Sequence, residues 1–219
     1  VIDYARTIMP AIRPKPAKNY AVAFMLGLAL PAAVLVVINL LNNKVTGEDE
    51  VRRFTNLPVA GHITHSQRDY QNVVLRDTQS VAAEAFRNLR TRMRFFTREI
   101  KSPVILVTSS MPAEGKTFTA LNLASACSLA GSKTVLVSFD LRRPKIFDEF
   151  GIDNGRGIST YLIGRDTIEE IIMETGYQNL YVVPAGPVPP NPSELASTEK
   201  TKELFAGLRE RFDVIVSDS

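Results

Sequence analysis

The sequence has very few of the residues that build disulfide frameworks and zinc centres. Its 219 residues include one cysteine, Cys127, and two histidines, His62 and His65. A single thiol excludes a disulfide framework and a cysteine-rich metal site within this chain. Two histidines without a second cluster of ligands also argue against a zinc centre.

The sequence also lacks a large excess of charge of one sign. Its 26 lysine and arginine residues against 23 aspartate and glutamate residues leave a formal net charge of +3. Without a blanket of positive charge, we expect no nucleic-acid partner. Hydrophobic residues make up 45% and charged residues 22% of the chain. Both values are near the globular average, which excludes a wholly disordered chain, a collagen-like chain and a coiled-coil rod.

One long segment has no charged residue. Tyr20–Leu41 is a run of 22 uncharged, mostly apolar residues. A helix of this length crosses the hydrocarbon core of about 30 Å, and membrane helices tolerate a proline such as Pro31. A buried helix of a soluble core is usually shorter, and a cleaved signal peptide has a shorter apolar run with a clean cleavage site. The segment 20–41 is therefore predicted to be a transmembrane helix.

The segments on either side of this helix differ in character. In the lead 1–19, Pro10, Pro14 and Pro16 favour an extended approach to the membrane. The polar segment 42–71 is typical of a linker. Basic residues precede and follow the span, so the positive-inside rule does not fix its orientation. Because the chain begins with Val1 and ends at Ser219 within a strand-like run, we expect it to be part of a longer protein.

Residues 72–219 have the pattern of an α/β domain. A helix from about Gln79 to Glu99 is predicted to place one apolar face on a core, formed by Ala82, Ala85, Phe86, Leu89, Met93 and Phe96. Short apolar runs then alternate with helical segments, at Val104–Thr108, Val135–Phe139, Leu180–Val183 and Val214–Val216. This alternation predicts βαβ units and a parallel sheet with flanking helices.

The most informative motif joins the first of these strands to the next helix. The loop runs Ser110-Met-Pro-Ala-Glu-Gly115-Lys116-Thr117, and strand, loop and helix follow in the order that a P-loop needs. Backbone N–H groups and the helix N-terminus would hold phosphates, Lys116 would reach the β- and γ-phosphates, and Thr117 would bind Mg²⁺. The residues expected to hold the nucleotide are Ser110, Met111, Pro112, Ala113, Glu114, Gly115, Lys116, Thr117 and Phe118.

Two aspartates follow or end buried strands. Asp140 comes after the run 134–139, and Asp218 closes the run 212–217. Parallel strands bring their carboxyl ends to the same edge of a sheet as the P-loop. Both carboxylates are therefore expected near Mg²⁺, although aspartates after strands are also common turn residues.

With these motifs the chain resembles the bacterial tyrosine kinases that are joined to polysaccharide co-polymerase membrane modules. Ser109–Thr117, Val135–Pro144 and Asp213–Ser219 resemble the Walker A, A′ and B motifs of that family. Glu84–Arg90 resembles its Glu-x-x-Arg-x-x-Arg oligomerisation helix, and Gly186–Leu195 resembles its proline-rich loop. The resemblance implies a P-loop NTPase-like fold preceded by one transmembrane helix.

Three positions depart from the related patterns. Ser110 replaces the usual first glycine of the loop, and Met111 stands where the related partitioning ATPases carry a signature lysine. Ser138 replaces the first of two Walker A′ aspartates, which in the family is implicated as the base for the tyrosine proton. Serine cannot be that base at neutral pH, so this departure bears on kinase activity rather than on ATP binding.

The resemblance implies an ATP- and Mg²⁺-dependent tyrosine autokinase of the bacterial inner membrane, with a cytoplasmic kinase domain that regulates polymerisation and export of an exopolysaccharide or capsule. Lys116, Asp140 and Asp218 would be catalytic, and Thr117, Asp140 and Asp218 would organise the metal. Glu84, Arg87 and Arg90 would join protomers into a ring, unless they form only a solvated helix face. Implied partners are the polysaccharide machinery, a tyrosine phosphatase and the membrane. The alternatives are an ATPase switch and a chain-length regulator in which ATP serves only as an assembly clamp.

Overall fold

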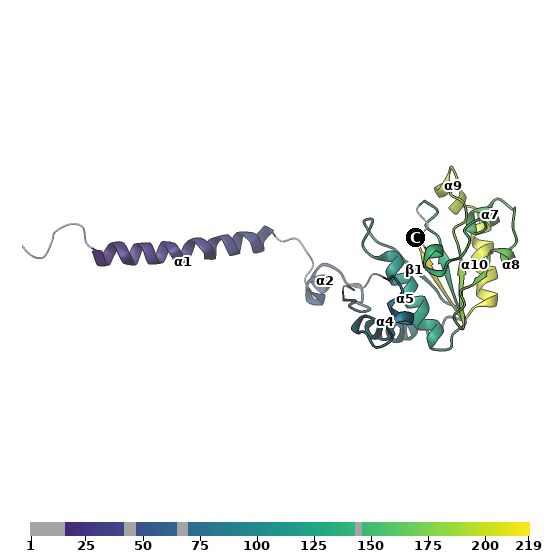
Figure 1. Cartoon of the computed structure of the whole chain (residues 1–219), viewed down its shortest axis with the longest axis horizontal. Coiled ribbons are helices and arrows are strands. Elements are labelled where there is room, and N and C mark those ends of the chain that lie inside the picture. Colours follow the sequence, from purple (N-terminus) through teal and green to yellow (C-terminus); the bar gives the residue numbers. More distant parts are fainter. Residues whose placement is uncertain (1–15, 42–46, 65–69, 143–145) are drawn as a thin grey trace, which may run out of the picture. The chain divides into compact units, whose positions relative to one another are not determined.

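A computed structural model describes residues 16–41, 47–64, 70–142 and 146–219 of the chain (Figure 1). The chain divides into two compact units, Val1–Pro58 and Val59–Ser219. Pro10 and Pro14 of the predicted extended lead lie outside the described residues, as does Pro144 of the A′ motif. Positions 42–46 and 65–69 of the predicted linker also lie outside them.

The first unit contains α1 (Pro16–Leu41), whose described side chains are all exposed. Its 26 residues extend about 39 Å at 1.5 Å per residue. Among the described residues it is the one helix long and apolar enough to cross a membrane. The helix starts four residues before the predicted boundary at Tyr20, because a proline such as Pro16 fits the first turn, where its missing N–H has no helical partner.

The first unit also contains a short helix within the predicted linker. Helix α2 (Glu48–Phe54) carries Arg52 and Arg53 in its last turn, where basic side chains complement the helix dipole. This part of the predicted linker is therefore helical.

The second unit is built on a five-stranded sheet with the order β1-β5-β2-β4-β3. The strands are β1 (Val104–Val107), β2 (Thr134–Ser138), β3 (Met173–Glu174), β4 (Leu180–Val183) and β5 (Val214–Asp218). The pairs β1–β5, β5–β2 and β2–β4 are parallel, and β3 pairs antiparallel with β4. The predicted parallel sheet is confirmed, and the two-residue strand β3 is too short to give a periodic signal.

Helices cover both faces of this sheet. Helices α3 (Val73–Arg76), α4 (Val81–Thr97) and α5 (Lys116–Leu129) share one buried cluster with the β-strands, and α6 (Ile146–Phe150) contributes Ile146 to it. Helices α7 (Ile158–Leu162), α8 (Ile168–Ile171) and α10 (Glu199–Arg211) share the second cluster. The short helix α9 (Pro192–Ala196) stands at one end of the unit (Figure 1).

Helix α4 lies within the predicted segment 79–99 and is capped by Ser80, whose Oγ accepts the Ala83 N–H at 3.2 Å. Ala82 and Phe86 are buried as predicted. Phe96 was predicted on the buried face but is 51% exposed. The buried residues of α4 all lie in its first half, so its last turns project from the core.

Candidate functional site

The loop between β1 and α5 is shaped by two residues with positive φ. Gly115 has φ 87° and is the N-cap of α5, and Ala113 has φ 66°. The left-handed conformation costs glycine little, whereas an alanine adopts it only where the surroundings hold it. This backbone turns the loop directly into the N-terminus of a 14-residue helix, where N–H groups and the helix dipole favour phosphate.

Hydrogen bonds inside the loop fix its first half. The Ser109 hydroxyl donates to the Met111 carbonyl at 2.8 Å, and the Met111 N–H donates to Glu114 Oε2 at 3.1 Å. The carboxylate of Glu114 therefore stabilises the loop itself. Met111 is exposed.

A cavity of about 610 Å³ opens beside this loop. Of the nine predicted nucleotide-binding residues, six line it: Pro112, Ala113, Gly115, Lys116, Thr117 and Phe118. Ser110, Met111 and Glu114 do not. The remaining lining residues include Asp140 and residues that the sequence did not single out, namely Gln71, Leu121, Ile146, Asp148 and Glu149. These five come from three separate segments, so no local motif could reveal them.

Thr117 and Asp218 meet at the base of the loop. The Thr117 hydroxyl donates to Asp218 Oδ2 at 2.7 Å across 101 residues of sequence. Asp218 is buried, and burial raises the pKa of its carboxyl. The hydrogen bond from Thr117 lowers this pKa, the charge of Asp140 raises it, and the charge of Lys116 lowers it. Thr117, Asp140 and Lys116 therefore all act on the carboxyl of Asp218.

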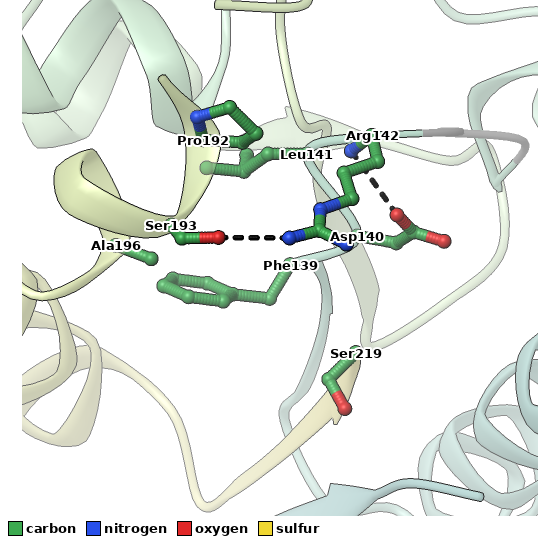
Figure 2. Close-up of a pocket in the computed structure, with 8 residues that line it drawn as sticks. All are labelled: Phe139, Asp140, Leu141, Arg142, Pro192, Ser193, Ala196 and Ser219. Carbon is green, nitrogen blue, oxygen red and sulfur yellow. Dashed lines mark hydrogen bonds between the residues drawn. The ribbon is translucent and has the colours of Figure 1, made fainter. Parts of the chain in front are cut away.

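Asp140 lies between two cavities. It lines the P-loop cavity and also a second one of about 300 Å³. Its Oδ1 accepts the Arg142 N–H at 3.1 Å, which holds the turn after β2 (Figure 2).

The second cavity has apolar walls and polar groups around them. Its lining residues are Phe139, Asp140, Leu141, Arg142, Pro192, Ser193, Ala196 and Ser219. Figure 2 shows the Arg142 side chain reaching α9, where it donates to Ser193 Oγ at 2.9 Å. Arg142 thus links the A′ segment to the proline-rich segment. Sequence reasoning did not assign it a role, because its contact joins segments 51 residues apart.

The arrangement suits Mg²⁺ better than a metal bound by protein ligands alone. The described residues contain no group of three or more His, Cys, Asp or Glu that could hold a metal ion. Mg²⁺ keeps several waters and is usually bound through one or two carboxylates together with substrate phosphates. The buried Asp218 Oδ1 has no hydrogen-bond partner among the described residues. This carboxylate oxygen lies on the residue that binds the Thr117 hydroxyl, and Thr117 lines the P-loop cavity, an arrangement that fits a hydrated Mg²⁺.

The three predicted oligomerisation residues make contacts within their own unit. Arg87 pairs with Glu84 one turn earlier at 2.6 Å and donates to the Thr78 carbonyl at 2.7 Å. Arg90 donates to the Ala126 carbonyl of α5 at 3.1 Å. A partner protomer would have to compete with these contacts or add to them.

The fold and the site together define a class. A Gly-Lys-Thr loop between a strand and a helix, on a mostly parallel sheet with an aspartate at the end of a neighbouring strand, is a P-loop NTPase-like nucleotide site.

Comparison with known proteins gives the family, although no protein-family model matches the chain. Tyrosine-protein kinase etk of Escherichia coli strain K12 is 25% identical over 240 residues, which cover 100% of this chain and 33% of that protein. The solved kinase domain of Escherichia coli ETK superposes with a TM-score of 0.74 at 28% identity, covering 80% of this chain and 73% of the other.

Two further relatives have higher identity. Tyrosine-protein kinase YwqD of Bacillus subtilis strain 168 is 31% identical over 153 residues, covering 69% of this chain and 65% of that protein. The crystal structure of the chimerical protein CapA2B2 is 32% identical with a TM-score of 0.71, covering 78% of this chain and 74% of the other. The chain belongs to the bacterial tyrosine kinase family, and it spans about a third of the length of the Escherichia coli relative.

Proposed function

We propose that this chain is the ATP-binding part of a membrane-anchored tyrosine autokinase. The observation that carries the proposal is the site itself, in which the P-loop and Asp140 line one cavity and Thr117 of that loop is hydrogen-bonded to Asp218. Membership of the bacterial tyrosine kinase family supplies the class of reaction.

In the proposed reaction a tyrosine hydroxyl of a neighbouring subunit attacks the γ-phosphorus of ATP. A bond forms from the phenolic oxygen to phosphorus, the bond from phosphorus to the β–γ bridging oxygen breaks, and ADP leaves with that electron pair. Lys116 stabilises the charge on the transferring group, and the loop N–H groups hold the phosphates in place. Bound Mg²⁺ would neutralise phosphate charge, with Thr117, Asp140 and Asp218 as its holders.

The proton of the tyrosine needs an acceptor other than residue 138, because Ser138 cannot act as a base at neutral pH. Asp140 is the carboxylate that reaches both cavities, so it is the residue we propose for this role.

The test uses the full-length protein in membranes with Mg-ATP. Phosphotyrosine is expected in the wild type and absent from Lys116→Met, since phosphoryl transfer depends on positioning and charge neutralisation. Ser138→Asp should increase it if the serine has weakened proton removal. Loss of phosphotyrosine in every form, with ATP still bound, would contradict the kinase proposal.

Ser138 also supports a second candidate, an ATPase switch without a phosphoprotein. Steady ATP turnover without phosphotyrosine would favour this switch. Binding of ATP with neither turnover nor phosphotyrosine would favour an assembly clamp in a chain-length regulator.

We further propose that α1 anchors the protein in the bacterial inner membrane, with the kinase domain in the cytoplasm. There it would regulate polymerisation and export of an exopolysaccharide or capsule, and a tyrosine phosphatase would reverse its phosphorylation. Replacing two central α1 residues, Leu28 and Val34, with lysine should move the protein from the membrane fraction, because charges at a helix centre cost about 3 kcal/mol each. Retention in the membrane would contradict this role of α1.

A further inference from the structure

Two buried polar atoms without partners occur at paired positions of the sheet. Ser138 ends β2, Asp218 ends β5, and the two residues are register partners. Ser138 is 1% and Asp218 2% exposed. Neither Ser138 Oγ nor Asp218 Oδ1 has a hydrogen-bond partner in the described parts of the chain. Because buried polar groups are nearly always paired and an unpaired one costs about 1–3 kcal/mol, each atom requires a partner.

Both side chains face the P-loop helix. Side chains alternate along a strand, and Leu136 and Val216, two residues before Ser138 and Asp218, belong to the core cluster that contains α5. The other oxygen of Asp218 accepts the hydroxyl of Thr117 from α5. The unpartnered oxygens therefore lie on the side of the sheet where Mg²⁺ would bind.

We propose that Ser138 is a positioning residue for the Mg²⁺ site and that its hydroxyl, together with Asp218 Oδ1, holds a water molecule of the hydrated ion. A serine hydroxyl both donates and accepts hydrogen bonds, whereas an ionised carboxylate only accepts. Ser138 can thus complete a water network around Asp218 without adding charge. This inference rests on the Mg-nucleotide part of the proposed function and not on transfer to tyrosine.

The charge at position 138 should decide how much the stability of the protein depends on bound Mg-ADP. An aspartate at this position would place a second carboxylate opposite buried Asp218, and like charges in register repel. Ser138→Asp should therefore lower the unfolding temperature in EDTA, and Mg-ADP should recover most of the loss. Ser138→Thr keeps the hydroxyl and should behave like the wild type in Mg²⁺ binding.

The test measures binding of fluorescent ADP to the full-length protein at increasing Mg²⁺ concentration. In Ser138→Ala the Mg²⁺ midpoint should rise about 10-fold, the usual effect of removing a residue that orients a metal's ligands. The affinity for ADP in EDTA should not change. The matched control is Ser217→Ala. Ser217 is also 1% exposed, and its Oγ also has no hydrogen-bond partner among the residues that the structure describes. Because side chains alternate along a strand, it lies on the opposite face of β5.

Equal Mg²⁺ midpoints in folded Ser138→Ala and wild type would overturn the inference, as would an equal shift in Ser217→Ala. If Ser138→Ala does not fold, a wild-type midpoint in Ser138→Thr supports the inference and a 10-fold shift there contradicts it. If ADP binding to the wild type does not depend on Mg²⁺ concentration, both this inference and the proposal of Mg²⁺ as cofactor are contradicted. Mg²⁺-dependent ADP binding without phosphotyrosine contradicts only the kinase reaction.

Discussion

At the scale of single residues, the fold disfavours the ionised carboxylate of Asp218, which is the form expected at neutral pH. Burial raises its pKa, so the folded protein binds its proton more tightly than the unfolded chain does. Stability is therefore lost as pH rises from the unfolded pKa through the folded one, and the loss persists at neutral pH. Residues tuned for a ligand often weaken the apo protein in this way.

Asp218→Asn removes this carboxylate while keeping an oxygen for the Thr117 hydroxyl. Without nucleotide or Mg²⁺, the variant should have a higher urea midpoint than the wild type at pH 7. The difference should shrink as pH falls toward 4. Urea unfolding followed by circular dichroism at several pH values measures both quantities, and a lower midpoint for the variant at pH 7 would contradict this account.

Cys127 gives a second residue-scale prediction. It is 5% exposed on α5, and burial raises the pKa of its thiol to about 11. Because the thiolate is the reactive form, the native protein should not be alkylated by iodoacetamide at pH 8, whereas the urea-unfolded chain should be. Mass spectrometry of intact protein reads the labelling, and rapid labelling of the native form would show that the helix is not packed as described.

Sequence reasoning could find the residues of the site that belong to local motifs. Lys116 and Thr117 follow from the loop, and the strand-end positions of Asp140 and Asp218 follow from apolar runs that end in an aspartate. The contacts of Arg142 with α9 and of Arg90 with α5 could not be predicted, because they join segments 51 and 36 residues apart. Such contacts depend on the packed fold and leave no periodic trace.

At the scale of elements, Asn122 joins α5 to the segment before α3. Its Oδ1 accepts the Val74 N–H at 3.0 Å, and its Nδ2 donates to the carbonyls of Gln71 and Phe118, each at 2.8 Å. Gln71 lines the P-loop cavity. This buried side chain therefore fixes one wall of the nucleotide site.

Asn122→Ala should destabilise the protein by about 1–3 kcal/mol, because it leaves the buried Val74 N–H without its partner and removes the hydrogen bond to the Gln71 carbonyl. It should also weaken ADP binding, because Gln71, which lines the P-loop cavity, would no longer be held in place. Leu129→Ala on the same helix is the control, since Leu129 is exposed and surface changes usually stay within about 0.5 kcal/mol. Equal urea midpoints for the two variants would contradict the structural role of Asn122.

The elements themselves were largely predictable, and the exceptions have physical causes. Strands β1, β2, β4 and β5 fall on the predicted apolar runs. A parallel strand buried on both faces, such as β2, reads as continuous hydrophobic sequence. Helix α2 was missed because its polar, charged sequence has no apolar face to mark it. The exposure of Phe96 was missed because periodicity gives the face of a helix but not the point at which it leaves the core.

At the scale of the whole molecule, we propose that protomers assemble into a ring through α4. The ion pair between Glu84 and Arg87 makes this proposal testable. The double variant Glu84→Ala/Arg87→Ala removes a pair that lies on the surface of its own protomer. It should lower the oligomer mass in detergent while changing protomer stability by less than about 1 kcal/mol, since exposed ion pairs contribute little.

The matched control removes the same kind of pair elsewhere. Glu199 and Lys202 on α10 form an exposed pair one turn apart at 2.8 Å. Light scattering should give the wild-type mass for Glu199→Ala/Lys202→Ala and a smaller mass for the α4 variant. The same mass for all three proteins would argue that Glu84 and Arg87 form only a solvated face.

Transfer of phosphate between subunits tests the proposed autokinase as a whole. Full-length wild type and a size-tagged, full-length Lys116→Met protein are reconstituted together in membranes with Mg²⁺ and γ-labelled ATP. We expect label on tyrosines of the Lys116→Met protein when wild type is present and none when it is alone, because Lys116 is needed in the subunit that donates phosphate. No labelled tyrosine on either protein, while both stay folded and the wild type binds ATP, would contradict the account.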